Sequence, residues 1–148
     1  MKRFTAILLA LVLGLGLAAC SNQGTSPSWE EQYEQGTGLL SEEKYDEAID
    51  AFTAAIEVDP AHPEVYAARG DAYRQLGKLE EAAQDYEKAL ELNANDGDTA
   101  VKLADILVEQ GKIEEAAGIL ENLVQQYPDN TTYSEKLNEI RQTAGTLP

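Results

Sequence analysis

Apolar and polar positions from residue 29 onward follow a helical rhythm that is interrupted at regular places. Apolar residues recur at spacings of three and four, which is typical of one face of an amphipathic helix. The clearest set is Ala48, Phe52, Ala55 and Ile56. Gly77 and Gly111, each followed by lysine, are typical of helix ends that need a left-handed residue. Pro60 and Pro128 close further helical stretches. The pattern predicts short helices joined by tight turns.

The helical stretches repeat along the chain with a period of 34 residues. Shifting the sequence by this period aligns small residues with small ones and large residues with large ones. The aligned sets include Gly36, Gly70 and Ala104; Ala48, Ala82 and Ala116; and Phe52, Tyr86 and Leu120. The period predicts three copies without a gap, at 29–62, 63–96 and 97–130.

A further amphipathic stretch follows the third copy. Tyr133, Leu137 and Ile140 share one helical face, and polar residues surround the rest. Such a helix is apolar toward the last repeat and polar outward, as a cap must be. We therefore predict a capping helix and tail over residues 131–148.

The period and the aligned residues resemble the tetratricopeptide repeat, a helix–turn–helix unit. The resemblance implies an all-α fold, namely a right-handed α-solenoid of three such repeats plus a C-terminal capping helix. The marks of the family have a physical reason. Glycine at positions 36 and 70 lets two helices approach closely, and an aromatic ring fills the space beside them.

The resemblance also implies that binding occurs on a concave face lined by the first helix of each copy. It places the following residues on that groove: Glu30, Tyr33, Thr37, Leu40, Glu64, Ala67, Asp71, Arg74, Asp98, Val101, Asp105 and Val108. In this set five acids face a single arginine. Some family members hold a peptide's terminal carboxylate with groove lysines and asparagines, and neither type occurs at these positions.

We therefore expect a protein or peptide partner of basic or mixed apolar and basic character. Two alternatives stay open. One is that the acids of the predicted groove only solvate an exposed face, and the other is that Tyr33 only packs beneath Trp29.

The first 28 residues are unlike the repeats. Lys2 and Arg3 precede an apolar stretch, and Ala18 and Ala19 lead into Cys20, which predicts a secretory signal over 1–19. The ending LAAC resembles the lipobox of bacterial lipoproteins, and this resemblance implies lipidation of the Cys20 thiol. A membrane-spanning anchor and an incidental thiol are the less favoured alternatives.

Residues 20–28 then form the lipidated cysteine and a flexible linker. The segment SNQGTSPS has no apolar residue and reaches at most about 26–29 Å when extended. The expected location is extracytoplasmic, on the outer leaflet of the cell membrane or on the outer membrane of a Gram-negative host. The folded part would then lie close to the membrane surface.

The chain is strongly acidic, with a formal net charge of −16. Without Lys2 and Arg3, nine basic residues stand against 27 acidic ones, a net charge of −18. Such a surface repels nucleic acids and anionic lipid headgroups, so we expect no nucleic-acid partner. Solubility alone is the alternative explanation of the charge.

Chemistry-bearing motifs are scarce. The one histidine, His62, precedes Pro63 at a predicted helix entry, and no cysteine is left once Cys20 is lipidated. The sequence contains no metal-spaced histidine pair and no phosphate-binding glycine loop. We expect no catalytic residue, metal or cofactor.

The sequence thus predicts a non-enzymatic, membrane-anchored adaptor that acts in an extracytoplasmic assembly. The first alternative is a structural envelope protein that forms homo-oligomers and has no dedicated peptide groove. The second is an enzyme or small-molecule carrier, which a shallow groove of three repeats disfavours.

Overall fold

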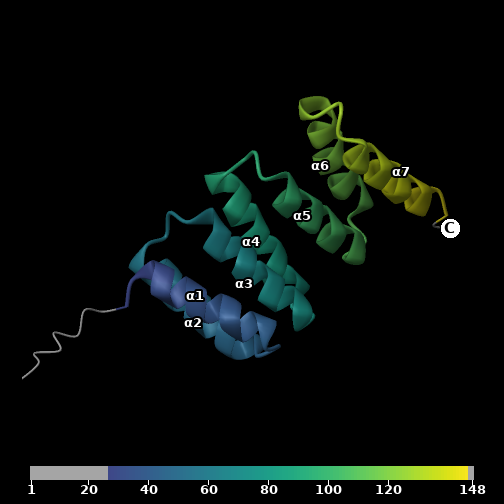
Figure 1. Cartoon of the computed structure of the whole chain (residues 1–148). Coiled ribbons are helices and arrows are strands. Elements are labelled where there is room, and N and C mark those ends of the chain that lie inside the picture. Colours follow the sequence, from purple (N-terminus) through teal and green to yellow (C-terminus); the bar gives the residue numbers. More distant parts are fainter. Residues whose placement is uncertain (1–26, 147–148) are drawn as a thin grey trace, which may run out of the picture.

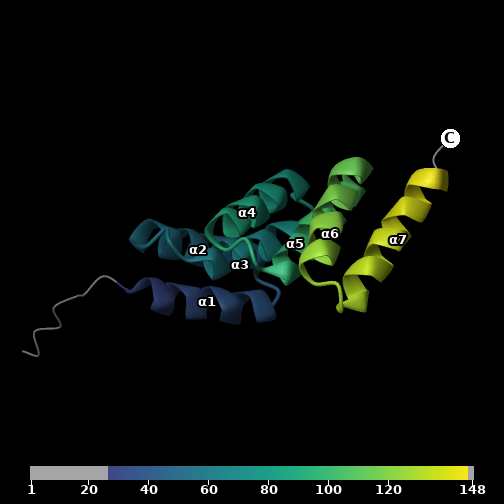
Figure 2. The same ribbon diagram turned by 90° about the horizontal axis from the view of Figure 1, so that it is seen from above.

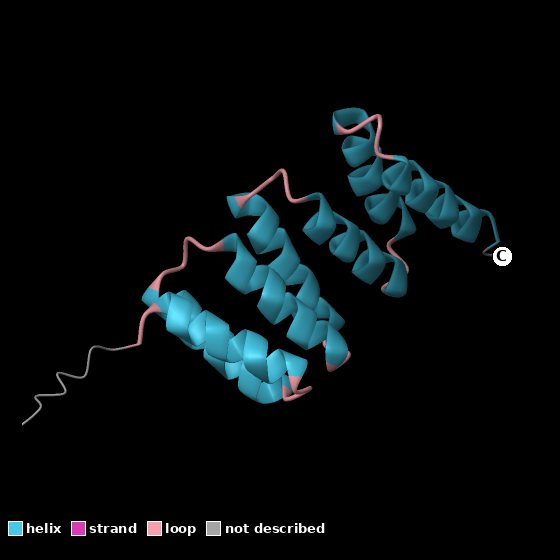
Figure 3. Cartoon of the chain, viewed as in Figure 1, coloured by secondary structure: helices cyan, strands magenta, loops and turns pink. Residues whose placement is uncertain are grey.

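The computed structural model describes residues 27–146, and its regular structure consists of seven helices without a strand (Figures 1 and 3). The helices are α1 (Trp29–Ser41), α2 (Tyr45–Val58), α3 (Pro63–Gln75), α4 (Leu79–Leu92), α5 (Gly97–Glu109), α6 (Ile113–Gln126) and α7 (Thr131–Thr146). The predicted signal segment, Cys20 and most of the predicted linker lie outside the described residues.

Helices that follow one another in sequence pack against each other as pairs, α1 with α2, α3 with α4, and α5 with α6 (Figure 2). The single helix α7 packs against α6 and ends the array. The predicted fold class, a solenoid of three helix–turn–helix repeats with a capping helix, is confirmed.

Each pair is held together by one large side chain that lies under a small residue. Phe52, Tyr86 and Leu120, which the period aligns, are all fully buried. A Cβ at Gly36 would lie 2.5 Å from Cε1 of Phe52, and a Cβ at Gly70 would lie 2.8 Å from Cε1 of Tyr86. Because real Cβ atoms do not come this close, glycine is required where the ring meets the opposite helix.

The turns inside the repeats depend on left-handed residues. Gly77 and Gly111 have φ angles of 71° and 77°, which confirms the prediction made for these glycines. Glu43 occupies the equivalent position of the first repeat with a φ of 61°. The first turn therefore places a side chain in a region that L-residues enter at a cost of about 1–2 kcal/mol.

The first repeat is fastened to the second at its N-terminal end. Ser28 and Glu31 form a capping box, in which each side chain accepts the other's backbone N–H. The Trp29 ring then stacks on His62, with ring centroids 3.4 Å apart. His62 is the N-cap of α3 and Pro63 its first residue, so this histidine lies at a helix entry as predicted.

A buried ion pair between α3 and α4, with a further hydrogen bond to α2, joins three helices. Arg69 of α3 donates two hydrogen bonds of 2.8 Å to Asp85 of α4 and one of 3.0 Å to Thr53 of α2. Asp85 is only 5% exposed, so its charge depends on this bidentate partner.

Two alanine substitutions in the same helix test the close approach. We expect Gly36→Ala to lower the free energy of unfolding by about 1–3 kcal/mol, because its Cβ collides with the buried ring of Phe52. Gly38→Ala is the matched control, since its Cβ meets nothing within 4 Å. It should raise stability by about 0.5–1 kcal/mol. Urea denaturation measures both, and equal shifts in the two variants would contradict the packing described.

Candidate functional site

The helices α1, α3, α5 and α7 share one surface of the array, called the groove face below. This face carries a hollow of about 530 Å³ between the ends of α1 and α3 and the middle of α5. The residues that line it are Leu40, Ser41, Glu43, Tyr45, Asp71, Arg74, Gln75 and Lys102. Most of these residues are charged or polar, and Leu40 and the Tyr45 ring add apolar surface, so this open hollow can accept a side chain with both polar and apolar parts.

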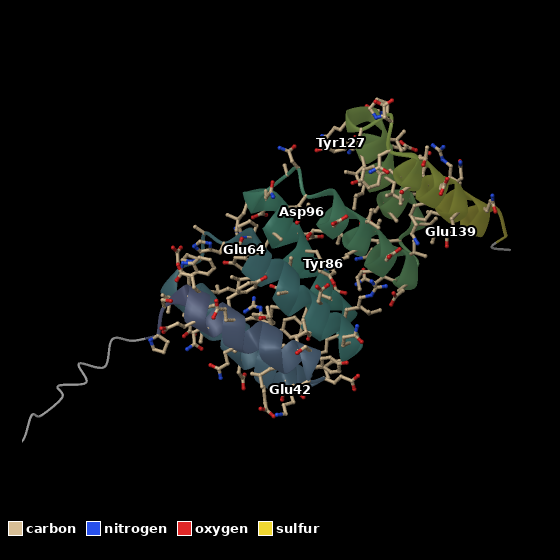
Figure 4. The ribbon with its side chains drawn as sticks, in the orientation of Figure 1. Glu42, Glu64, Tyr86, Asp96, Tyr127 and Glu139 are labelled. Atoms are coloured by element: carbon tan, nitrogen blue, oxygen red, sulfur yellow. The ribbon has the colours of Figure 1, made fainter. Side chains whose placement is uncertain are left out.

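Three of the predicted groove acids lie in the first turns of their helices. Glu30, Glu64 and Asp98 are exposed near the starts of α1, α3 and α5. Figure 4 shows Glu64 and Asp96 along the edge of the array where these helices begin, with Glu42 at the opposite edge. The remaining predicted residues are partly exposed: Tyr33, Thr37, Leu40, Ala67, Asp71, Arg74, Val101, Asp105 and Val108.

The structure brings Asp71 against two partners that the sequence did not reveal. The Tyr86 hydroxyl donates to Oδ1 of Asp71 at 2.7 Å, and Nζ of Lys102 donates to Oδ2 at 2.7 Å. Burial of the ring and the hydrogen bond to Asp71 raise the pKa of Tyr86 above its usual value. Tyr86 is therefore a structural residue that also orients a groove carboxylate.

Asp105 and Arg74 form a second set of contacts one repeat further along. Nζ of Lys136, on α7, lies 2.9 Å from Oδ1 of Asp105. Arg74 donates to Glu109 at 2.7 Å and lies 3.9 Å from Oδ2 of Asp105. The hydrogen bond to Asp105, together with nearby acids, raises the pKa of Lys136.

The structure adds two cations to the five acids and the single arginine of the predicted groove positions. Lys102 and Lys136 also belong to the groove face, and they reach Asp71 and Asp105 from the neighbouring helix. Sequence reasoning missed them because it selected one side of each helix, whereas lysine is long enough to cross to the next. The signal was present, since both lysines follow their aspartate by the same number of residues.

The acids at the start of the helices differ from Asp71 and Asp105. Within residues 27–146, no cation is in contact with Glu30 or Asp98. Glu64 lies 3.2 Å from Nδ1 of His62. The negative charge of the groove face is consequently neutralised toward the ends of α3 and α5 and is least compensated near their starts.

Tyr33 has contacts on both sides of its ring. Its ring centroid lies 5.9 Å from that of Phe52 and 6.4 Å from that of Trp29, so part of its role is packing. Burial, followed by the charges of Glu64 and Asp71, raises the pKa of its hydroxyl.

The described part of the chain contains neither a metal site nor a membrane-spanning helix. Across residues 27–146 the side chains of His, Cys, Asp and Glu form no group of three or more that could hold a metal ion. In the same range no helix has the length and apolarity needed to cross a membrane.

Comparison with known proteins identifies the class of fold. Two tetratricopeptide-repeat family models match residues 33–97 and 73–140, which overlap and together span most of the array. This chain belongs to the tetratricopeptide-repeat family.

Solved structures of similar fold include peptide complexes. The first repeat domain of Spaghetti (RPAP3), bound to the HSP90 peptide SRMEEVD, is 28% identical with a TM-score of 0.73, covering 80% of this chain and 94% of that one. The second repeat domain of human RPAP3, in complex with the HSP70 peptide SGPTIEEVD, is 28% identical with a TM-score of 0.68, covering 74% and 92%. The Yersinia enterocolitica secretion chaperone SycD is similar in fold, at 18% identity and a TM-score of 0.69 over 78% and 93%.

The raised pKa of Tyr86 predicts a loss of stability in alkali. The folded chain keeps the phenol proton above pH 10, where an unfolded tyrosine loses it, so the free energy of unfolding falls as the pH rises through that value. We expect Tyr86→Phe to lose about 1–3 kcal/mol at neutral pH, because Asp71 loses a donor. Between about pH 9 and pH 11, the free energy of unfolding of this variant should then fall by less than that of the native protein.

Denaturant midpoints at the two pH values measure this difference. Tyr127→Phe, at an exposed tyrosine, is the control and should follow the native protein. An alkaline loss of the same size in native protein and Tyr86→Phe would contradict the assignment.

Proposed function

We propose that this protein is a membrane-anchored adaptor of the bacterial cell envelope whose groove face binds a protein segment of basic or mixed apolar and basic character. The observation that supports this most strongly is the pair of exposed acids, Glu30 and Asp98, that lack a cation among the described residues. They lie on the same face as Tyr33 and an open hollow.

The comparison with peptide-bound relatives supports a role in peptide binding, and the charges of the groove face argue for a different ligand. Both RPAP3 domains hold peptides that end in EEVD, an acidic sequence. Here the cations of the groove face, Arg74, Lys102 and Lys136, each lie against an acid of the chain itself. An acidic peptide would have to displace these acids, whereas a basic one meets Glu30 and Asp98 directly.

The proposed anchor rests on the sequence around Cys20. The charged start, the apolar stretch and LAAC precede a linker that ends where Ser28 caps α1. Two or more acyl chains hold a protein stably on a membrane, whereas a single chain binds only marginally. The groove would thus be held within a few nanometres of the membrane, a suitable position for an adaptor.

Charge reversal at the unpaired acids tests the groove. Glu30→Lys combined with Asp98→Lys should weaken binding of fluorescein-labelled hexalysine at least tenfold at low salt, since two attractive contacts become repulsive. Fluorescence polarisation measures the affinity. Glu87→Lys combined with Glu114→Lys is the matched control, because these exposed acids lie on α4 and α6. Equal weakening by the two double variants would mean that net charge, and not the groove, attracts the probe.

Lipidation is tested independently of the groove. In a bacterial host fed an alkyne-bearing fatty acid, the native chain should take up the label and Cys20→Ser should take up none, because the thiol is the attachment atom. Ser21→Ala is the control and should be labelled like the native chain. An unlabelled native chain, or a labelled Cys20→Ser variant, would contradict the proposed anchor.

A further inference from the structure

The same ion pair recurs in two successive repeats of the groove face. Asp71 of α3 pairs with Lys102 of α5 at 2.7 Å, and Asp105 of α5 pairs with Lys136 of α7 at 2.9 Å. Aspartate and lysine are equally far apart in sequence in both cases. We call these two contacts the Asp–Lys pairs. They join the second repeat to the third and the third repeat to the capping helix.

In each pair a different residue contacts the second oxygen of the aspartate. Tyr86 donates to Oδ1 of Asp71, which leaves Oδ2 to Lys102. Arg74 lies 3.9 Å from Oδ2 of Asp105, and Lys136 takes Oδ1. One oxygen of Asp71 is therefore hydrogen-bonded to Tyr86, and one oxygen of Asp105 lies within ion-pair distance of Arg74. In both cases a lysine contacts the other oxygen.

Lys102 and Lys136 have properties that allow a ligand to displace them from their aspartates. Their side chains are 38% and 28% exposed, and each is a flexible stem with a strongly hydrated ammonium group. Asp71 and Lys102 both line the 530 Å³ hollow, so this pair is open to a ligand. When Lys102 leaves, the Tyr86 hydroxyl still orients the Asp71 carboxylate, which can then accept another cation. When Lys136 leaves, Arg74 stays near Asp105 but does not hydrogen-bond it.

We infer that Lys102 and Lys136 are built-in substitutes for basic side chains of the partner, and that a basic ligand binds by replacing them on Asp71 and Asp105. This inference rests on the proposed function, in which the partner is basic. An isolated cation gains little, because it exchanges one ion pair for another. A segment that carries several basic residues replaces both lysines while it also contacts Glu30 and Asp98. The lysines thus select against singly charged ligands.

Removing the lysines should therefore strengthen binding of a basic ligand. Fluorescein-labelled hexalysine is the probe, and fluorescence polarisation at low salt gives its affinity. We expect Lys102→Gln and Lys136→Gln each to tighten binding about two- to fivefold, the range that partly exposed ion pairs contribute. Lys88→Gln is the matched control. Lys88 pairs with Glu91 within α4, so this substitution removes the same charge at a place away from the groove face. Its effect should be smaller than that of either groove variant.

A second background shows whether the gain passes through the aspartate. In a chain that carries Asp71→Asn, the further change Lys102→Gln should tighten binding no more than Lys88→Gln does, while Lys136→Gln should keep its larger gain. Thermal melting of each variant identifies any loss of fold. A gain from Lys102→Gln that stays larger than that of Lys88→Gln in this background would overturn the inference.

The outcomes separate the inference from the function on which it rests. In one outcome, native protein binds hexalysine, charge reversal of Glu30 and Asp98 abolishes this binding, and the groove lysine variants behave like Lys88→Gln. The proposed exchange is then wrong, whereas the proposed binding of a basic partner stands. If native protein binds hexalysine no better than hexaglutamate, the proposed preference for a basic partner fails, and the exchange fails with it.

Discussion

The structure depends on the close approach of the two helices within each repeat. Phe52, Tyr86 and Leu120 are fully buried at equivalent positions, and Gly36 and Gly70 leave no space for a Cβ beside the first two rings. This contact sets how the first helix of each pair lies on the second. It therefore also sets which residues of α1, α3 and α5 reach the groove face. A change in this packing would alter both stability and the arrangement of the acids.

The groove face has two regions that differ in how far their acids are paired with cations. Near the ends of α3 and α5, acids and cations neutralise one another through contacts that cross from helix to helix, such as Asp71 with Lys102. Near the starts of the helices, Glu30 and Asp98 have no such contacts among the described residues. Partly exposed ion pairs contribute little to stability, and in the exchange proposed above their main effect is on which ligands can compete for the carboxylates. The strong negative charge of the whole chain acts in the same direction by attracting basic segments.

The fold was predictable from the sequence because it follows from a period and from residue size. The left-handed turns at Gly77 and Gly111 were predictable because glycine is typical of a positive φ. The equivalent turn at Glu43 was not, since glutamate gives no indication of a positive φ. The groove acids were predicted from the resemblance to the tetratricopeptide repeat, which places the first helix of each copy on the groove. The lysines opposite them were missed because contact across neighbouring helices depends on side-chain reach, which a helical pattern does not contain. The buried Arg69–Asp85 pair was missed for the same reason.

The most direct test of the account is site-specific photo-crosslinking in intact cells. A photoreactive residue in place of Thr37, on the groove face, is compared with one in place of Gln84, exposed on α4. The account predicts a protein adduct from position 37 that disappears when Glu30 and Asp98 are reversed in charge, and no such adduct from position 84. An adduct that forms at position 84 and is absent at position 37 would contradict the assignment of binding to the groove face.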